Sequence, residues 1–284
     1  MKKNCIVVPI YKDFFKLSNE EKISLVQLYK ILSTHPIYFI GPSSLDFKEY
    51  LVHAKTMNVA VHVKEFENFY FNNIQGYNQL LLSEKFFKAF HQHEFLLIYQ
   101  TDAFVFRDEL NFWSSKGYDY IGAPWFLGFD KPDPTNQIIG VGNGGFSLRN
   151  VKKSILMLKR LKQLLNLNKL WKMSGLKKIF AFQRLHFLFK IFLQVKNIDA
   201  LTGLEENELF EDRFWSENIP ALFSDFTIAP VSEAMKFSFE VNPSLLFKLN
   251  NNLLPFGCHA RERWEPKFWE THIPTSFRNS QELQ

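Results

Sequence analysis

Cysteine is scarce in this sequence of 284 residues, which contains only Cys5 and Cys258. Two cysteines without CxxC spacing exclude a disulfide framework, so reduced thiols and a cytoplasmic location are expected. Long apolar runs are absent as well, because charged residues interrupt the best candidate, between Ile179 and Val195, short of the roughly 20 residues that span a membrane. The apolar start of the chain is too short for a signal peptide and contains Pro9, which favours a buried strand.

Glycine-rich phosphate loops are missing too. No Lys-Ser or Lys-Thr pair follows Gly142, Gly144 and Gly145 at the spacing of a P-loop, and no GxGxxG opens a helix. Glycines allow close backbone approach. The run therefore predicts either a tight turn between strands or a loop that lies against a ligand, where Asn143 could form a hydrogen bond.

Charge is present but unevenly distributed. Hydrophobic residues make up 46% and charged residues 22% of the chain, which excludes disorder, and the length suits one domain with an insertion. The net charge is +5, but residues 150–198 hold twelve Lys or Arg and no Asp or Glu, while the remaining chain carries a charge of −7. We expect a single domain over residues 1–284 with a basic amphipathic helical insertion at 150–198.

The first half of the chain alternates short apolar runs with helical patterns. Ser18 and Glu21 form a capping-box pair ahead of one such helix. This alternation predicts an α/β fold with a mostly parallel sheet and helices on both faces, and ligands of such sheets bind beyond the carboxyl ends of the strands. Strands are expected at Cys5–Ile10, Ile37–Ile40, Val59–Val63, Phe95–Tyr99 and Tyr120–Trp125, and helices at Gln79–Phe90 and Leu204–Asn218.

Three acidic residues are candidates for chemistry. Asp102 directly follows an expected buried strand, where it could hold a divalent cation together with substrate phosphates, or merely cap the helix near Asp108. Glu211 and Asp212 could supply a general base, or they could be solvated acids in an acidic helix; a base at Asp212 would need its pKa raised by burial. Trp125, where the expected strand runs into a Pro and aromatic loop, is expected to be exposed and could stack on a sugar.

Eight short phrases of the sequence, taken in order, carry a resemblance to a known family. The phrases are VVPIY, GYNQLLLS, QTDAFVF, YDYIGAPW, GNGGFSLR, EDRFW, APVSEAMKFSFE and PFGCHA. Together they resemble the glycosyltransferases of the GT-A superfamily, and in particular a bacterial and viral family of glycosyltransferase-like proteins. The resemblance covers the chain from residue 6 to residue 260 except for the basic segment.

The resemblance implies a GT-A-like fold and transfer of a sugar from a nucleotide diphosphate, most often UDP, with inversion at the anomeric carbon. It also implies Mn²⁺ or Mg²⁺ as cofactor. Gln100 departs from the superfamily, since it stands where the first aspartate of an Asp-any-Asp motif would be. The residues implied are Asp212 with Glu211 for catalysis; Asp102 and His259 for the metal; Pro9, Tyr11, Lys12, Asn78, Gln100 and Asp102 for the donor nucleotide; and Trp125, Asn143, Gly144 and Gly145 for the sugar or acceptor.

Several partners and functions stay open at this point. The acceptor would be a cell-surface saccharide or a lipid-linked sugar, as in polysaccharide or lipopolysaccharide biosynthesis. The Lys-rich segment suits the anionic inner face of a plasma membrane, or it packs on the core or on a second subunit. Nucleic acid is disfavoured because the segment has only two arginines, Arg160 and Arg184. The alternatives to an enzyme are a catalytically silent nucleotide- or sugar-binding protein and a membrane-surface adaptor.

Overall fold

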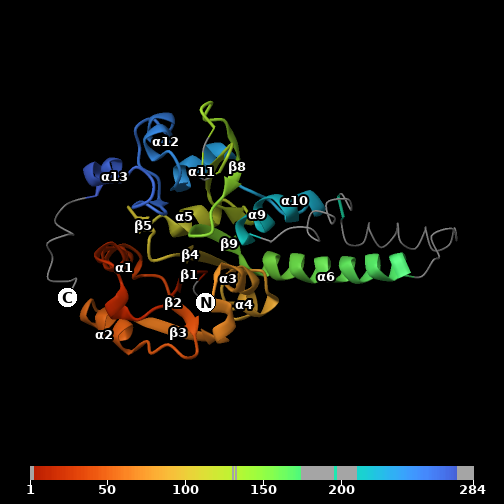
Figure 1. The fold of residues 1–284 in the computed structure, drawn as a ribbon, viewed down its shortest axis with the longest axis horizontal. Helices are drawn as coiled ribbons and strands as arrows, with labels where there is room; N and C mark the ends of the chain where they lie inside the picture. The colour runs from red at the N-terminus through yellow and green to blue at the C-terminus, as the bar shows by residue number, and fades with distance from the viewer. Residues whose placement is uncertain (1–2, 130, 132, 174–194, 197–209, 274–284) are drawn as a thin grey trace.

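A six-stranded sheet forms the centre of the computed structural model, which describes residues 3–129, 131, 133–173, 195–196 and 210–273. Its strand order is β3-β2-β1-β4-β9-β6 (Figure 1). The first four strands run parallel, and β9 is antiparallel to β4 and β6. These strands are β1 (Asn4–Pro9), β2 (Ile37–Pro42), β3 (Val61–Phe66), β4 (Phe95–Tyr99), β6 (Tyr120–Ile121) and β9 (Phe146–Asn150). The expected α/β fold, with a mostly parallel sheet, is confirmed.

Helices cover both faces of this sheet because alternate residues of its strands are apolar and buried. Ile6 and Val8 of β1 pack in one core with α1, α2 and α5, and Cys5 and Val7 pack in a second core with α3, α4 and α6. The helices are α1 (Asn19–Leu32), α2 (Lys48–Thr56), α3 (Ile74–Leu81), α4 (Glu84–Lys88), α5 (Leu110–Ser115) and α6 (Val151–Met173), with short 3-10 helices η1 (Phe14–Lys16) and η2 (Asn68–Phe71).

Local sequence signals locate most of these elements. Ser18 and Glu21 form the expected capping box at the start of α1. The expected helix at Gln79–Phe90 is wrong in its bounds, because Ser83 accepts a hydrogen bond from the backbone N–H of Phe86 at 3.1 Å and thereby starts a second helix. The expected strand at Tyr120–Trp125 is likewise two strands, in different sheets.

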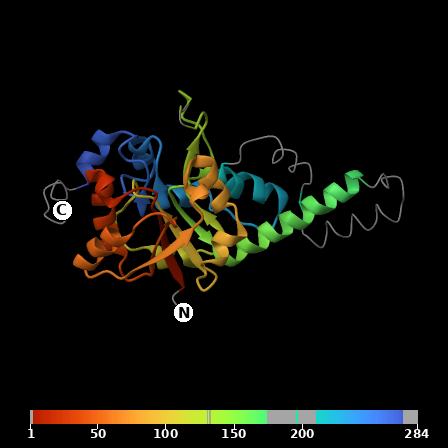
Figure 2. The same ribbon diagram turned by 60° about the horizontal axis from the view of Figure 1, so that its bottom comes forward.

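Among the described residues, two smaller sheets and a third apolar core accompany the central sheet. The strands β5 (Phe104–Val105), β10 (Ser238–Phe239) and β11 (Gly257–Cys258) form one small sheet, and β7 (Ala123–Phe126) pairs with β8 (Ile138–Gly142) in a projecting ribbon (Figure 2). The remaining elements are α9 (Glu211–Arg213), the π-helical turn η5 (Phe214–Asn218), α10 (Ile219–Leu222), α11 (Val231–Phe237), α12 (Pro243–Leu249) and α13 (Pro266–His272). Of the helix expected at Leu204–Asn218, residues 204–209 lie outside the described residues.

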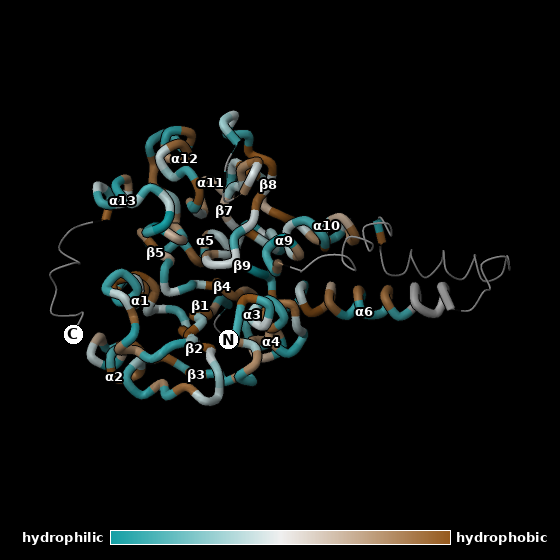
Figure 3. The backbone as a smooth tube through the Cα atoms, in the orientation of Figure 1, coloured by the Kyte–Doolittle hydropathy of each residue, from teal (hydrophilic) through white to brown (hydrophobic). Residues whose placement is uncertain are grey.

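The start of the basic segment is a helix that is anchored to the second core. Buried side chains of α6, among them Met157, Leu161 and Leu164, pack in the same cluster as Phe86 and Phe90. Hydrophobic and hydrophilic residues alternate along this helix as it extends away from the body (Figures 1 and 3). Within the described ranges no helix is both long and apolar enough to cross a membrane. The end of the insertion at residue 198 stays a prediction, because residues 174–194 and 197–209 are not described.

Candidate active site

The main cleft opens where β1 and β4 end, as expected for a parallel sheet. Its volume is about 710 Å³. Six residues proposed from the sequence line it: Pro9, Tyr11, Lys12, Gln100, Asp102 and His259. These residues come from three segments that are far apart in the sequence, and the fold brings them to one wall.

His259 is the centre of the polar cluster in this cleft, and it follows directly on β11. Its Nδ1 lies 2.9 Å from Oε1 of Glu240, while its Nε2 lies 3.2 Å from both Oδ1 of Asp102 and Oε1 of Gln100. Burial disfavours the protonated imidazole, but the carboxylates of Asp102 and Glu240 outweigh this and raise the pKa of His259 to about 10. Without a bound cation, the cluster therefore carries a positive charge held between two negative ones, and the imidazole must lose its Nε2 proton before that nitrogen can hold a metal ion.

The same atoms offer part of a site for a divalent cation. Adjacent ligands of an octahedral Mg²⁺ or Mn²⁺ lie roughly 3 Å apart; Oδ1 of Asp102 and Nε2 of His259 are separated by 3.2 Å. A carboxylate on the other ring nitrogen, as Glu240 provides, is the usual support of a metal-binding histidine. Among the residues described, no group of three or more His, Cys, Asp or Glu could hold a metal. The donor set thus fits a cation only if substrate oxygens or water complete the shell.

The end of β1 gives the cleft a cation and an exposed ring. Lys12 Nζ lies 2.7 Å from Oε2 of Glu21, the capping-box residue, and Glu21 also accepts a hydrogen bond from the Thr101 hydroxyl at 3.0 Å. Tyr11 is 59% exposed, and its ring centroid is 5.9 Å from Nζ of Lys12. The Glu21 carboxylate, which caps α1, therefore also holds the side chains of Lys12 and Thr101 in place in the cleft lining.

The loop between β8 and β9 lies behind the cluster and allows two close contacts. A Cβ on Gly145 would stand 2.0 Å from Nε2 of His259, and one on Gly144 would stand 2.6 Å from Oε1 of Glu211. Asn143 has a φ of 149°, and its Oδ1 accepts hydrogen bonds from the N–H groups of Gly145 and Phe146. The loop is a connection between two sheets, and glycine at these positions lets both functional side chains approach.

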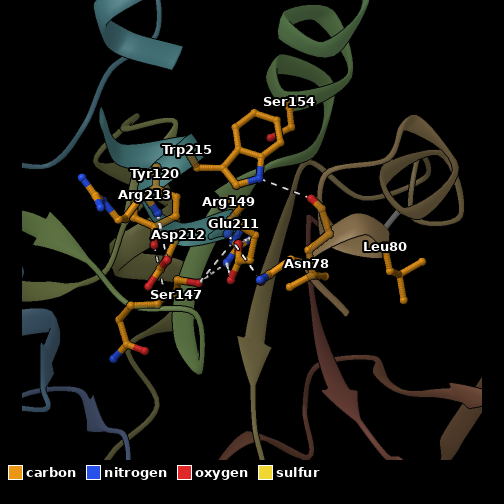
Figure 4. Close-up of polar contacts among 12 residues, drawn as sticks. Asn78, Leu80, Tyr120, Ser147, Arg149, Ser154, Glu211, Asp212, Arg213 and Trp215 are labelled. Atoms are coloured by element: carbon orange, nitrogen blue, oxygen red, sulfur yellow. Dashed lines mark hydrogen bonds and ion pairs between the residues drawn. The ribbon is translucent and has the colours of Figure 1, made fainter. Parts of the chain in front are cut away.

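Glu211 and Asp212 begin α9, beside the cleft rather than on its lining. The Glu211 carboxylate forms a buried ion pair with Arg149, with Nη1 to Oε2 at 2.6 Å and Nη2 to Oε1 at 3.0 Å (Figure 4). Ser147 Oγ accepts further hydrogen bonds from Arg149. Burial raises the pKa of Glu211 and the guanidinium opposes that shift. The possibility that Glu211 is a solvated acid is wrong, since the residue is 3% exposed.

Asp212 has a carboxyl group whose pKa is shifted far above its ordinary value. It is half-buried, and burial together with the negative charges of Glu211 and Glu240 raises its pKa to about 7. Its Oδ1 accepts a hydrogen bond from the N–H of the neighbouring Arg213 at 2.9 Å. The π-helical turn follows immediately, and such turns often occur at functional sites. The carboxylate is therefore poised to bind or release a proton near neutral pH.

Two sequence-based assignments change in the structure. Trp125 is not an exposed stacking residue: it is 6% exposed, in β7, and its ring lies where a Cβ on Gly142 would be. Asn78 does not line the cleft; its Oδ1 instead accepts the N–H of Glu211 at 3.4 Å.

Two further residues were missed by the sequence reasoning, Glu240 and Arg149. Both are the last letters of phrases noted above, KFSFE and FSLR, and only their positions at the ends of strand-like runs could have pointed to them.

The fold and this site define an α/β protein with an acidic, histidine-centred cleft at the carboxyl end of a parallel sheet. The chain belongs to the family described as protein of unknown function DUF5672, whose model matches residues 60–259. No curated protein matches the chain.

Solved glycosyltransferase structures have a similar arrangement at low identity. The glycosyltransferase GlyE of Streptococcus pneumoniae TIGR4 is 12% identical with a TM-score of 0.46; the match covers 98% of this chain and 62% of GlyE. TarS (residues 1–349) of S. aureus in complex with UDP-GlcNAc is 16% identical over 57% of this chain and 48% of TarS, with a TM-score of 0.33. Core-mannan synthase A of Aspergillus fumigatus, in its Mn/GDP form, is 10% identical over 44% of this chain and 43% of that enzyme, with a TM-score of 0.34. At these values the similarity concerns the fold alone.

Proposed function

We propose that this protein is a glycosyltransferase that moves a sugar from a nucleoside diphosphate, UDP first among them, to a hydroxyl group of a saccharide or lipid-linked acceptor. The observation that carries the proposal is the cleft in which Asp102, Gln100 and Glu240 converge on His259. Lys12 stands on the same wall. A donor diphosphate needs cationic partners beside a carboxylate that can share a metal ion, and this wall offers both.

Each part of the donor has a matching group in the cleft. The exposed ring of Tyr11 offers a flat apolar face to a nucleobase, and the compact charge of Lys12 suits a phosphate. Asp102 Oδ1 and His259 Nε2 would hold Mn²⁺ or Mg²⁺, with phosphate oxygens completing the shell. The bound ion would supply positive charge that offsets the charge of the leaving diphosphate.

Asp212 is the proposed base. Its carboxylate takes the proton of the acceptor hydroxyl, whose oxygen forms the bond to the anomeric carbon. The bond from that carbon to the diphosphate oxygen breaks, and its electron pair leaves with the nucleoside diphosphate. A single displacement of this kind inverts the anomeric centre. A pKa of about 7 suits a base that acts at neutral pH. Glu211, already paired with Arg149, positions Asp212 and does not itself move a proton.

Thermal shift measurements test donor binding. A ligand at 100 times its Kd stabilises a protein by about 2.7 kcal/mol. UDP or a UDP-sugar with Mn²⁺ should raise the Tm of the native protein, and GDP serves as the comparison nucleotide. Asp102→Asn should abolish the shift, whereas Glu270→Gln, an exposed change in α13 outside the cleft lining, should keep it. If no nucleotide shifts the Tm with either metal, the proposal is refuted.

Donor hydrolysis separates an enzyme from a silent binding protein. Slow release of UDP from a UDP-sugar needs no acceptor, and it should be lost in Asp212→Asn while the Tm shift with UDP is retained. A nucleotide-induced Tm shift without any turnover would instead favour the silent binding protein, an alternative that the departure at Gln100 supports.

A further inference from the structure

A second groove lies at the opposite end of the central sheet from the cleft. Its volume is about 650 Å³, and its lining includes Lys3, Glu94, Lys152, Lys153 and Leu156. Glu94 precedes β4, whereas Gln100 follows it, so the groove and the cleft lie at the two ends of the same strand. The groove is therefore separate from the site proposed above.

The charge of the groove is mainly positive. Nζ of Lys3 lies 3.9 Å from Oε2 of Glu94, and Lys153 lies 2.8 Å from Asp225. These two acids offset two of the three lysines. Lys152 is exposed at the mouth of the groove, so its charge faces solvent. A group with a negative charge is the complementary ligand.

The exposed face of α6 continues this surface. Lys152, Leu156, Lys159 and Lys162 follow one another at intervals of four, three and three residues, which places them on one side of a helix. All four are exposed, and the opposite side is buried in the second core. No acidic residue occurs between residues 150 and 166. The helix extends away from the body of the protein in both views (Figures 1 and 2).

We propose that the groove and this face of α6 form a docking surface for an anionic lipid bilayer, with a lipid phosphate beside Lys152 and α6 lying along the headgroups. A row of lysines on a straight helix complements a plane of negative charge. Leu156, which is 39% exposed, lies between the lysines. Its apolar side chain can insert into a bilayer, whereas a nucleic-acid backbone offers it no apolar partner. Arginine, which reads base edges, is not among these four exposed residues, and the neighbouring Arg160 is paired with Asp225.

The orientation has a consequence for the cleft. The five residues of β4 separate the two sites by roughly 17 Å along the strand, and the cleft opens away from the docked end. If the protein is the proposed transferase, the acceptor hydroxyl is then one that stands above the headgroups, such as the distal end of a growing saccharide.

Vesicle sedimentation of the full chain tests this surface. Vesicles of phosphatidylcholine with phosphatidylglycerol should bind the protein at low salt, and vesicles of phosphatidylcholine alone should not. The triple change Lys152→Gln, Lys159→Gln, Lys162→Gln should weaken binding by about fivefold for each lysine removed. The matched control makes the same change at three exposed lysines elsewhere, Lys48→Gln, Lys55→Gln and Lys248→Gln. It should bind vesicles like the native protein.

The result that overturns the proposal is equal binding by the native protein and the triple variant, or an equal loss in the control. Leu156→Ser adds a second arm: it should lower vesicle binding further while leaving any binding of a DNA duplex unchanged. If the triple variant loses only duplex binding, the surface belongs to nucleic acid. If free inorganic phosphate binds in the groove while vesicles do not bind the protein, a soluble phosphate is the ligand. Circular dichroism and Tm confirm that each variant is folded.

Discussion

Replacing Asp212 by asparagine should make the protein more stable and inactive. The carboxyl binds its proton more tightly in the folded state, because its pKa there is about 7 instead of the ordinary 3.8. Below pH 4 the group is protonated in both states and costs nothing. As the pH rises from 4 to 7 the unfolded state releases this proton while the folded state keeps it, so native stability falls. Above pH 7 the folded state carries the unfavourable charge and the full difference is lost. An amide of the same size avoids this cost.

The magnitude follows from the size of the shift. About three pKa units at 1.36 kcal/mol each give up to about 4 kcal/mol of added stability at pH 8, and about zero at pH 4. For a chain of this size that corresponds to an increase in Tm of up to about 8 °C. The Arg213 N–H keeps an acceptor in the asparagine side chain, so no hydrogen bond is lost. Transfer or donor hydrolysis should fall by about 10² to 10⁴ if Asp212 is the base.

Urea unfolding at pH 4 and pH 8 measures the effect, since other carboxyl groups titrate equally in both proteins. Asp225→Asn is the matched control with the opposite sign: although burial raises the pKa of Asp225, Lys153 and Arg160 lower it below the ordinary value. That variant should lose stability at pH 8 and change little at low pH. The reasoning fails if Asp212→Asn has the same stability relative to the native protein at both pH values.

Three other substitutions give separate checks. Arg149→Met leaves the Glu211 carboxylate buried without its partner and should cost about 3 to 5 kcal/mol of stability in urea unfolding. Adding Glu211→Leu should recover most of that loss. If it recovers none, the loss does not come from breaking the ion pair. Gly145→Ala should abolish the Tm shift with UDP and Mn²⁺, because the new Cβ would displace the imidazole behind it, whereas Gly140→Ala, with nothing within 4 Å, should bind like the native protein. Trp125→Ala should cost about 3 to 5 kcal/mol of stability, and a loss below 1 kcal/mol would show that its ring is not part of the packing.

The sequence by itself determined the elements of the fold. The strand at Phe95–Tyr99 has the expected bounds, and the capping box at Ser18 forms as expected, because each depends on residues that are neighbours in the chain. Alternating strands and helices predict a parallel sheet. Gln100 and Asp102 follow a strand of that sheet, so they were expected at its carboxyl edge. Residues that follow strands could thus be assigned to the cleft without coordinates.

Only the tertiary structure decided which polar groups meet and which side chains are buried. Glu240 reaches His259, and Arg149 reaches Glu211, 62 residues away, because β9, β10, β11 and α9 converge behind one loop. No local pattern specifies such distant pairings. Burial is decided in the same way: Trp125 looks like a loop residue in the sequence, yet the ribbon of β7 and β8 folds its ring onto Gly142. The pKa of Asp212 depends on these same neighbours, so the proton-binding behaviour of the site is a property of the fold.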